Sequence, residues 1–203
     1  MKIALIGATG MAGSRILEEL VSRGHYVKAI ARNTHKVPDT ERVLSVDVDL
    51  NDHEALVEAL KGQDAVISAV PFHGLDANAL INTIRDSKVK RYLVVGGAGG
   101  LTIPNKNVRL LDTDDFPAAY KPEAEAAVNF LEKLKHVDDI EWTFISPSAE
   151  FAPGKRTGEF RLGKDELIIG KDGSKISAED FAIALSDEIE NDNHINQRFT
   201  VGY

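Results

Sequence analysis

Short apolar segments alternate with helix-like segments along most of this chain, and that alternation constrains its fold more than any other feature. The apolar segments end at turn-forming residues and are typical of buried strands. They are Lys2–Ile6, Tyr26–Ala31, Val43–Val48, Ala65–Val70, Arg91–Val95 and Glu141–Ile145. Between them, apolar side chains at helical spacing predict helices over Met11–Arg23, Asp52–Lys61, Asp76–Asp86 and Glu123–Lys135. We therefore expect an α/β fold, a doubly wound parallel sheet with helices on both faces.

The pattern changes after Pro147. The elements predicted there are short strands at Glu159–Leu162 and Glu166–Ile169, a helix over Ser177–Glu190 and a terminal strand over Gln197–Tyr203. A region this small is not expected to form a core of its own. We expect a single domain over residues 1–203. Its core would span 1–147, and 148–203 would form a cap region and terminal strand beside the carboxyl ends of the main strands.

Composition narrows the classes of partner. With 24 Lys and Arg against 32 Asp and Glu, the formal net charge is −8, so we expect no nucleic acid and no membrane partner. There is no cysteine, which excludes disulfides and thiolate chemistry. The first apolar run is short and unlike a secretory signal, so we expect a cytoplasmic protein. We expect it to be a monomer or a homodimer. None of the six histidines has another at helical spacing, so we expect no metal site.

The turn between the first strand and the first helix reads Gly7-Ala-Thr-Gly10-Met-Ala-Gly13. Gly7 would allow a tight turn, Gly10 would let the backbone approach a pyrophosphate, and Gly13 would let the helix pack close to the sheet. The free amide groups of the first helical turn would then face the anion. The alternative is a glycine-rich turn that binds nothing.

Further stretches occur together with this motif, at Asp64–Val70, Leu93–Gly99 (LVVGGAG), Trp142–Pro147 (WTFISP), Ser148–Gly158 and Ile176–Ala182 (ISAEDFA). With this set the chain resembles, over nearly its whole length, the atypical branch of the short-chain dehydrogenase/reductase superfamily. Within that branch it is similar to the NAD(P)H-binding group of NmrA-like proteins, biliverdin/flavin reductases and NADH-flavin reductases. The resemblance implies a Rossmann-type fold and a nicotinamide dinucleotide cofactor.

The second predicted strand ends without the carboxylate that usually binds the ribose hydroxyl of NAD. Arg32 stands there instead, with Lys36 nearby, and a guanidinium can bind the 2′-phosphate of NADP. We therefore favour NADP, with NAD as the alternative cofactor. A solvated Arg32 on a surface loop is the competing interpretation.

The resemblance implies roles for other residues. Thr9 and Met11 would join the three glycines at the cofactor. Asp47 would accept from the adenine amino group while Val48 lines the ring. The alternative for Asp47 is a plain turn or cap role. Cofactor contacts are also implied for Ala69, Val70, Pro71, Pro147, Ser148 and Ala149. Phe151 would stack on a planar substrate, or else be a core aromatic residue.

The usual proton-transfer pair of the superfamily is missing. Tyr120 precedes the right helix, but the residue four positions on is Ala124 rather than lysine, and Ala98 or Gly99 stands at the usual serine position. Tyr120 and His73 are therefore only weak catalytic candidates, and His73 suits a bystander role as well. Hydride transfer to a flavin needs less acid–base chemistry, because solvent can supply the proton.

We therefore predict an NAD(P)H-dependent oxidoreductase that reduces a flavin, quinone or similar planar acceptor. The alternatives are an NADP-binding sensor without turnover and an NAD(P)-dependent epimerase or dehydratase. The connection from Ala98 to Pro122 is unusually long, and we interpret it as a substrate lid, with a plain surface excursion as the alternative.

Overall fold

A single large sheet forms the centre of the computed structural model, which describes residues 1–38 and 40–203. Its strand order is β3-β2-β1-β4-β5-β6-β10-β8, and every pairing is parallel except that of β8 with β10. The strands are β1 (Lys2–Ile6), β2 (Tyr26–Ala31), β3 (Val43–Asp47), β4 (Ala65–Ser68), β5 (Arg91–Val95), β6 (Glu141–Ser146), β8 (Arg161–Gly163) and β10 (Gln197–Gly202). The chain turns outward from β1 in both directions, which is the doubly wound arrangement predicted from the sequence.

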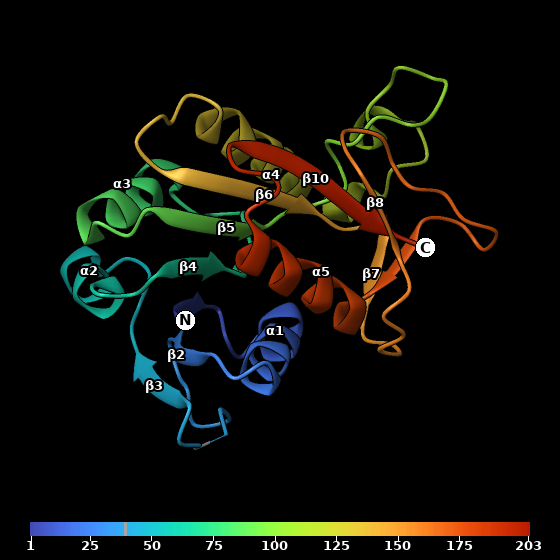
Figure 1. Ribbon diagram of the computed structural model, residues 1–203. Coiled ribbons are helices and arrows are strands. Elements are labelled where there is room, and N and C mark those ends of the chain that lie inside the picture. The colour runs from blue at the N-terminus through green and yellow to red at the C-terminus, as the bar shows by residue number, and fades with distance from the viewer. Residues whose placement is uncertain (39) are drawn as a thin grey trace.

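Helices cover both faces of the sheet (Figure 1). They are α1 (Met11–Ser22), α2 (His53–Leu60), α3 (Ala77–Ser87), α4 (Lys121–Leu134) and α5 (Ala178–Asn191). Successive strand residues point to opposite faces, so Ile3 and Leu5 pack with α1 and α5, whereas Ala4 and Ile6 pack with the layer of α2, α3 and α4. All elements predicted before Pro147 are present, with ends within two residues of those expected.

The chain after Pro147 departs more from expectation. The strand predicted at Glu159–Leu162 is β8, shifted to Arg161–Gly163, and the predicted helix is α5. The strand predicted at Glu166–Ile169 is wrong, because only Glu166 makes an isolated bridge, to Thr102. A small parallel pair of β7 (Glu150–Ala152) and β9 (Lys175–Ser177) was not expected. Strand β10 lies beside β6 and α5 lies against α1, so this region extends the sheet and covers one of its faces.

The long connection after β5 contains two short 3-10 helices, η1 (Leu110–Asp112) and η2 (Ala118–Tyr120). Its first part contacts the chain that follows β8: the Thr102 amide donates to the Asp165 carbonyl at 2.9 Å, and the Leu167 amide donates to the Thr102 carbonyl at 2.8 Å. In Figure 1 this connection, in green, and the orange segment around β8 both extend beyond the carboxyl ends of β5 and β6. Both segments therefore lie at the end of the sheet where ligands of such folds bind.

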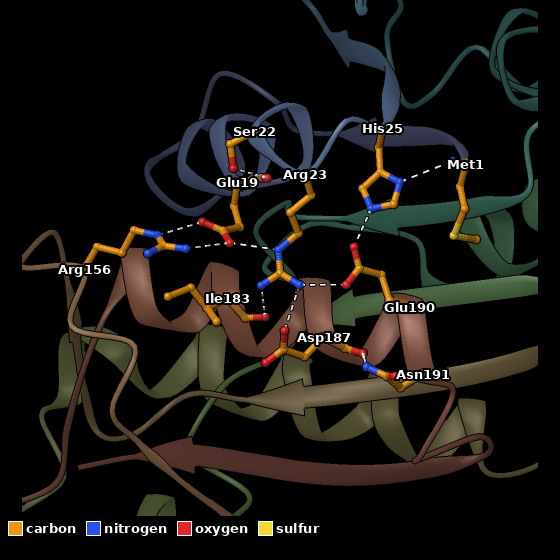
Figure 2. A network of polar contacts seen from close by, with 10 residues as sticks. All are labelled: Met1, Glu19, Ser22, Arg23, His25, Arg156, Ile183, Asp187, Glu190 and Asn191. Carbon is orange, nitrogen blue, oxygen red and sulfur yellow. Dashed lines mark hydrogen bonds and ion pairs between the residues drawn. The ribbon is translucent and has the colours of Figure 1, made fainter.

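A polar network joins α1 to α5 and to the segment after β7 (Figure 2). The buried carboxylate of Glu19 accepts from Arg23 at 2.9 Å and from Arg156 at 2.9 and 3.0 Å. Arg23 also donates to Asp187 at 2.7 Å and to Glu190 at 2.8 Å. These ion pairs lower the pKa of Glu19, the hydrogen bond from Arg156 being the largest cause. The network fixes α1, the helix that follows the glycine motif, against the C-terminal helix.

Candidate cofactor site

A cleft of about 430 Å³ opens at the carboxyl ends of β1, β2, β3 and β4. Nine of the residues proposed from the sequence line it, and they come from four separate turns: Gly7, Thr9, Gly10, Arg32, Val48, Ala69, Val70, Pro71 and His73. The parallel sheet brings these turns together because all of its central strands end at the same edge. Met11 and Gly13 belong to the first turn of α1 and do not line the cleft.

Two of the motif glycines are required by the protein itself. Gly7 has a positive φ of 82°, and a Cβ atom there would lie 2.3 Å from the Ala69 carbonyl oxygen. A Cβ atom on Gly13 would lie 2.0 Å from the Gly7 carbonyl oxygen. At Gly10, by contrast, the nearest atom to a Cβ would be the Gly7 carbonyl oxygen at 3.4 Å, which the protein tolerates. The glycine at position 10 therefore leaves open a cradle that a side chain would fill.

Helix α1 begins at the cleft without a side-chain cap. Its N-cap is Gly10, no side chain among residues 1–38 and 40–203 bonds to its first amides, and its first turn holds no acidic residue. Helices α2, α3 and α5 differ, because Asp52, Asp76 and Ser177 accept hydrogen bonds from their first turns. The first amides of a helix lack intrahelical partners and carry partial positive charge. The start of α1 thus has the chemistry to bind an anion, and the residues present fit the pyrophosphate of a dinucleotide.

One cationic side chain, Arg32, lines the β2 end of the cleft. Arg32 follows β2, is exposed and lines the cleft. Lys36 lies instead in a neighbouring, mainly apolar depression between α1 and the loop after β2. The guanidinium of Arg32 is therefore the cation placed to bind a phosphate at this end.

Asp47 does not line the cleft. Its Oδ1 accepts from the Thr34 hydroxyl at 2.7 Å and from the Thr34 amide at 2.8 Å, and these two bonds lower the pKa of the carboxyl. The turn role considered for Asp47 therefore matches its contacts. The next acidic residue, Asp49, lines the cleft with Leu50 and Asn51, and sequence reasoning missed all three. Strand β3 ends at Asp47, so its alternation does not extend to Asp49 and could not have placed it.

The residues predicted around the nicotinamide have mostly structural contacts. The Ser148 hydroxyl is buried and donates to the Val201 carbonyl at 3.0 Å, while the Ala149 amide donates to the Ser174 hydroxyl at 3.2 Å. Pro147 lies in the same turn after β6 and is buried. The ring centroids of Phe151 and Phe181 in α5 lie 4.8 Å apart, which matches the core packing considered for Phe151. None of these four lines the described cleft.

The two weak catalytic candidates occupy different environments. Tyr120 is 67% exposed at the start of α4 and does not line the cleft, with Ala124 rather than a lysine one turn later. His73 lines the cleft from the loop after β4. Packing requires glycine at positions 96 and 99 after β5, since a Cβ atom on Gly96 would lie 2.1 Å from the Phe144 ring and one on Gly99 would lie 2.7 Å from the Ala124 side chain.

Asp180 is fully buried at the start of α5 and fixes two segments near the carboxyl end of the sheet. It accepts from the Thr157 amide at 2.8 Å, the Thr157 hydroxyl at 2.6 Å, the Gly158 amide at 2.9 Å and the Tyr203 hydroxyl at 2.7 Å. Burial alone would raise the pKa of this carboxyl, but the hydrogen bonds outweigh burial and lower it. Asp180 is therefore a structural anion that ties the C-terminal residue to the segment after β7.

Across residues 1–38 and 40–203, no group of His, Asp and Glu side chains has the arrangement of a metal site. None of the helices in that same part of the chain is long and apolar enough to span a membrane.

The fold and the cleft define a dinucleotide-binding protein, and comparison with known families agrees. The model of a family described as NAD(P)H-binding matches residues 7–192, so the chain belongs to that family. This range includes the glycine motif, the cleft and α5. The resemblance inferred from the sequence is confirmed at this level.

Three relatives illustrate the range of names within the group. The uncharacterized protein YwnB of Bacillus subtilis is 45% identical, over 99% of this chain and 98% of its own. A structure from Bacteroides thetaiotaomicron, provisionally named an epimerase, has a TM-score of 0.93 and 39% identity, covering 100% and 96% of the two chains. A structure from Streptococcus pneumoniae, provisionally named an NADH-flavin reductase, has a TM-score of 0.86 and 37% identity, covering 100% and 99%.

Proposed function

We propose that this protein is an NADPH-dependent reductase that transfers hydride from the nicotinamide to a flavin, quinone or similar planar acceptor. The observation that carries the proposal is the uncapped start of α1 beside Gly10, in a cleft that also contains Arg32. The bound cofactor supplies the hydride. The protein's own residues would bind the phosphates and position the cofactor.

Different residues of the cleft would bind different parts of the cofactor. The amides at the start of α1 would bind the pyrophosphate, and Arg32 would bind the 2′-phosphate with charge-assisted hydrogen bonds. Val48, Asp49 and Leu50 line the same end as Arg32 and would surround the adenine. Ala69, Val70 and Pro71 are small or apolar, and they allow the ribose and pyrophosphate to approach the end of β4.

The choice of a planar acceptor rests on the acid–base groups at the site. Carbonyl–alcohol chemistry in this superfamily uses a tyrosine activated by a lysine one helical turn away. Here Tyr120 is exposed outside the cleft and is followed by Ala124 at that spacing. Reduction of a flavin or quinone fits a site of this kind, because bulk solvent can protonate the reduced acceptor.

Steady-state oxidation of NADPH and NADH, followed by absorbance with FMN, riboflavin and quinones in turn, tests the proposal. We expect turnover with at least one planar acceptor and a preference for NADPH. If calorimetry shows NADPH binding but no acceptor is reduced, the protein is a dinucleotide sensor and the reductase proposal is wrong.

A further inference from the structure

Glu123, in the first turn of α4, holds the backbone of the loop that follows β4. Its Oε1 accepts from the Phe72 amide at 2.8 Å and its Oε2 accepts from the His73 amide at 2.7 Å. Each carboxylate oxygen thus satisfies one backbone donor, and bonds to a charged acceptor are stronger than those to a neutral one. Because 51 and 50 positions separate the partners, no local pattern in the sequence indicates this contact.

The same helix holds this loop at a second point. The Phe72 ring is buried and packs edge-to-face on Phe130 of α4, with ring centroids 5.3 Å apart. Phe72 also lies 6.0 Å from the Phe144 ring of β6. Helix α4 therefore fixes both the backbone and one side chain of the loop, and this leaves the next residue, His73, exposed on the wall of the cleft.

The strand order places this loop along the cofactor. Arg32 follows β2, the start of α1 follows β1, and His73 follows β4, and these three strands are neighbours in the order β2-β1-β4. A dinucleotide with its 2′-phosphate at Arg32 and its pyrophosphate at α1 must continue toward β4. Its nicotinamide half therefore reaches the loop that Glu123 holds.

Building on the proposed function, we propose that Glu123 is a positioning residue for the nicotinamide half of NADPH. By fixing the amides of Phe72 and His73, it sets the position of the cleft wall formed by His73 and Gly74. The adenosine half would bind mainly at Arg32 and the turn after β3, whereas the two bonds of Glu123 go to the loop after β4.

Glu123→Gln tests this inference by calorimetry with two ligands, NADPH and adenosine 2′,5′-bisphosphate, which lacks the nicotinamide half. A glutamine can accept from one of the two amides, but its own NH₂ group faces the other and leaves it unpaired. We expect NADPH to bind about three- to tenfold more weakly, because a loop that has lost one anchor must be ordered on binding, at a cost of about one net hydrogen bond. Binding of adenosine 2′,5′-bisphosphate should stay unchanged.

Glu125→Gln is the matched control, because it makes the same chemical change at an exposed position on the same helix. It should leave both dissociation constants unchanged. Equal losses for both ligands in Glu123→Gln, or no loss for NADPH, would overturn the inference. If Glu123→Gln does not fold, the same pair of ligands is measured with Glu123→Asp, where the selective loss is again expected and its absence is again decisive.

These binding measurements need no acceptor. A wild-type protein that binds NADPH without turnover would therefore refute the reductase proposal while leaving the role of Glu123 open to the same two-ligand test. A wild-type protein that does not bind NADPH would refute the cofactor site itself.

Discussion

The Cα of Gly13 faces the Gly7 carbonyl oxygen so closely that a Cβ atom on Gly13 would lie 2.0 Å from it. This contact lets the first turn of α1 rest directly on the end of β1. Gly10 lies between the two but has no such contact, since a Cβ atom there would come no closer than 3.4 Å to another atom of the protein. The fold thus requires a glycine at positions 7 and 13 but not at position 10.

Gly10→Val should abolish NADPH binding and leave the fold largely intact. The valine side chain fits the extended backbone of Gly10, with φ −73° and ψ 173°, but occupies the cradle at the start of α1. Calorimetry measures the loss of NADPH binding, and circular dichroism checks that the fold is intact. As a contrast, Gly13→Ala should cost roughly 1–3 kcal/mol of folding free energy or prevent folding, because the added methyl overlaps backbone. Unchanged NADPH affinity in Gly10→Val would remove the phosphate site from this turn.

Arg32→Ala should weaken NADPH binding by about ten- to a hundredfold and leave NADH binding nearly unchanged. The reason is that only NADPH offers a 2′-phosphate to the guanidinium, and hydrogen bonds to charged groups contribute roughly 1.5–3 kcal/mol each before solvent screening. Dissociation constants for both cofactors, at two salt concentrations, measure the effect. Added salt should bring the dissociation constants for NADPH and NADH closer together in the wild type. In the variant it should barely change their ratio. Equal losses for NADPH and NADH would show that Arg32 does not select the cofactor.

Tyr120→Phe should lower turnover by less than tenfold. Tyr120 is 67% exposed, does not line the cleft and has Ala124 where an activating lysine would stand. A general acid in contact with substrate typically contributes about 10²–10⁴-fold. Steady-state rates with the best planar acceptor are the measurement. A loss of that size at unchanged NADPH affinity would make Tyr120 a proton donor and contradict the proposed acceptor class.

Acid should destabilise the protein in part through Asp180. Its hydrogen bonds from Thr157, Gly158 and Tyr203 hold its folded-state pKa below the unfolded value of about 3.9. The unfolded state therefore binds the proton more readily. The stabilisation from this carboxylate is present above about pH 4 and is lost as the pH falls through the folded-state pKa.

Asp180→Asn should accordingly be less stable than the wild type at neutral pH, by about 1–3 kcal/mol, because the amide group cannot accept all of these bonds. Its stability should also fall less steeply below pH 4. Urea unfolding of both proteins at several pH values gives both quantities. Parallel pH profiles for the two proteins would mean that Asp180 does not contribute to acid sensitivity.

Much of the fold was predictable because its signals are local. The strands from Lys2–Ile6 to Glu141–Ser146 and the helices between them follow from apolar periodicity within a few residues, and the parallel sheet follows from their alternation. The positions of Gly7, Gly10 and Gly13 between a strand and a helix likewise indicated a dinucleotide site before any contact was known. Arg32 could be placed at the cleft because it ends a strand adjacent to the one that carries the motif.

The remaining features depend on contacts between distant parts of the chain. Strands β7 and β9 are three residues each and exist through their pairing, Glu150 with Lys175 and Phe151 with Ile176, which no window of sequence contains. The predicted strand at Glu166–Ile169 has the same local character but, apart from a bridge at Glu166, finds no partner strand among the described residues. A short strand is stabilised by its neighbour, so pattern alone did not decide which of these segments would form one.

In the candidate site, too, some features follow from local sequence and others from contacts between distant residues. The sequence alone predicts a phosphate site where β1 meets α1, because glycine spacing and helix geometry act locally. Only the tertiary structure decided that Asp49 rather than Asp47 lines the cleft, that Phe151 packs on Phe181, and that Glu123 holds the backbone at His73. In each case the contact joins residues from separate elements of the structure. Such contacts depend on how the whole chain packs, because their hydrogen-bond and contact energies are gained only when the distant groups meet.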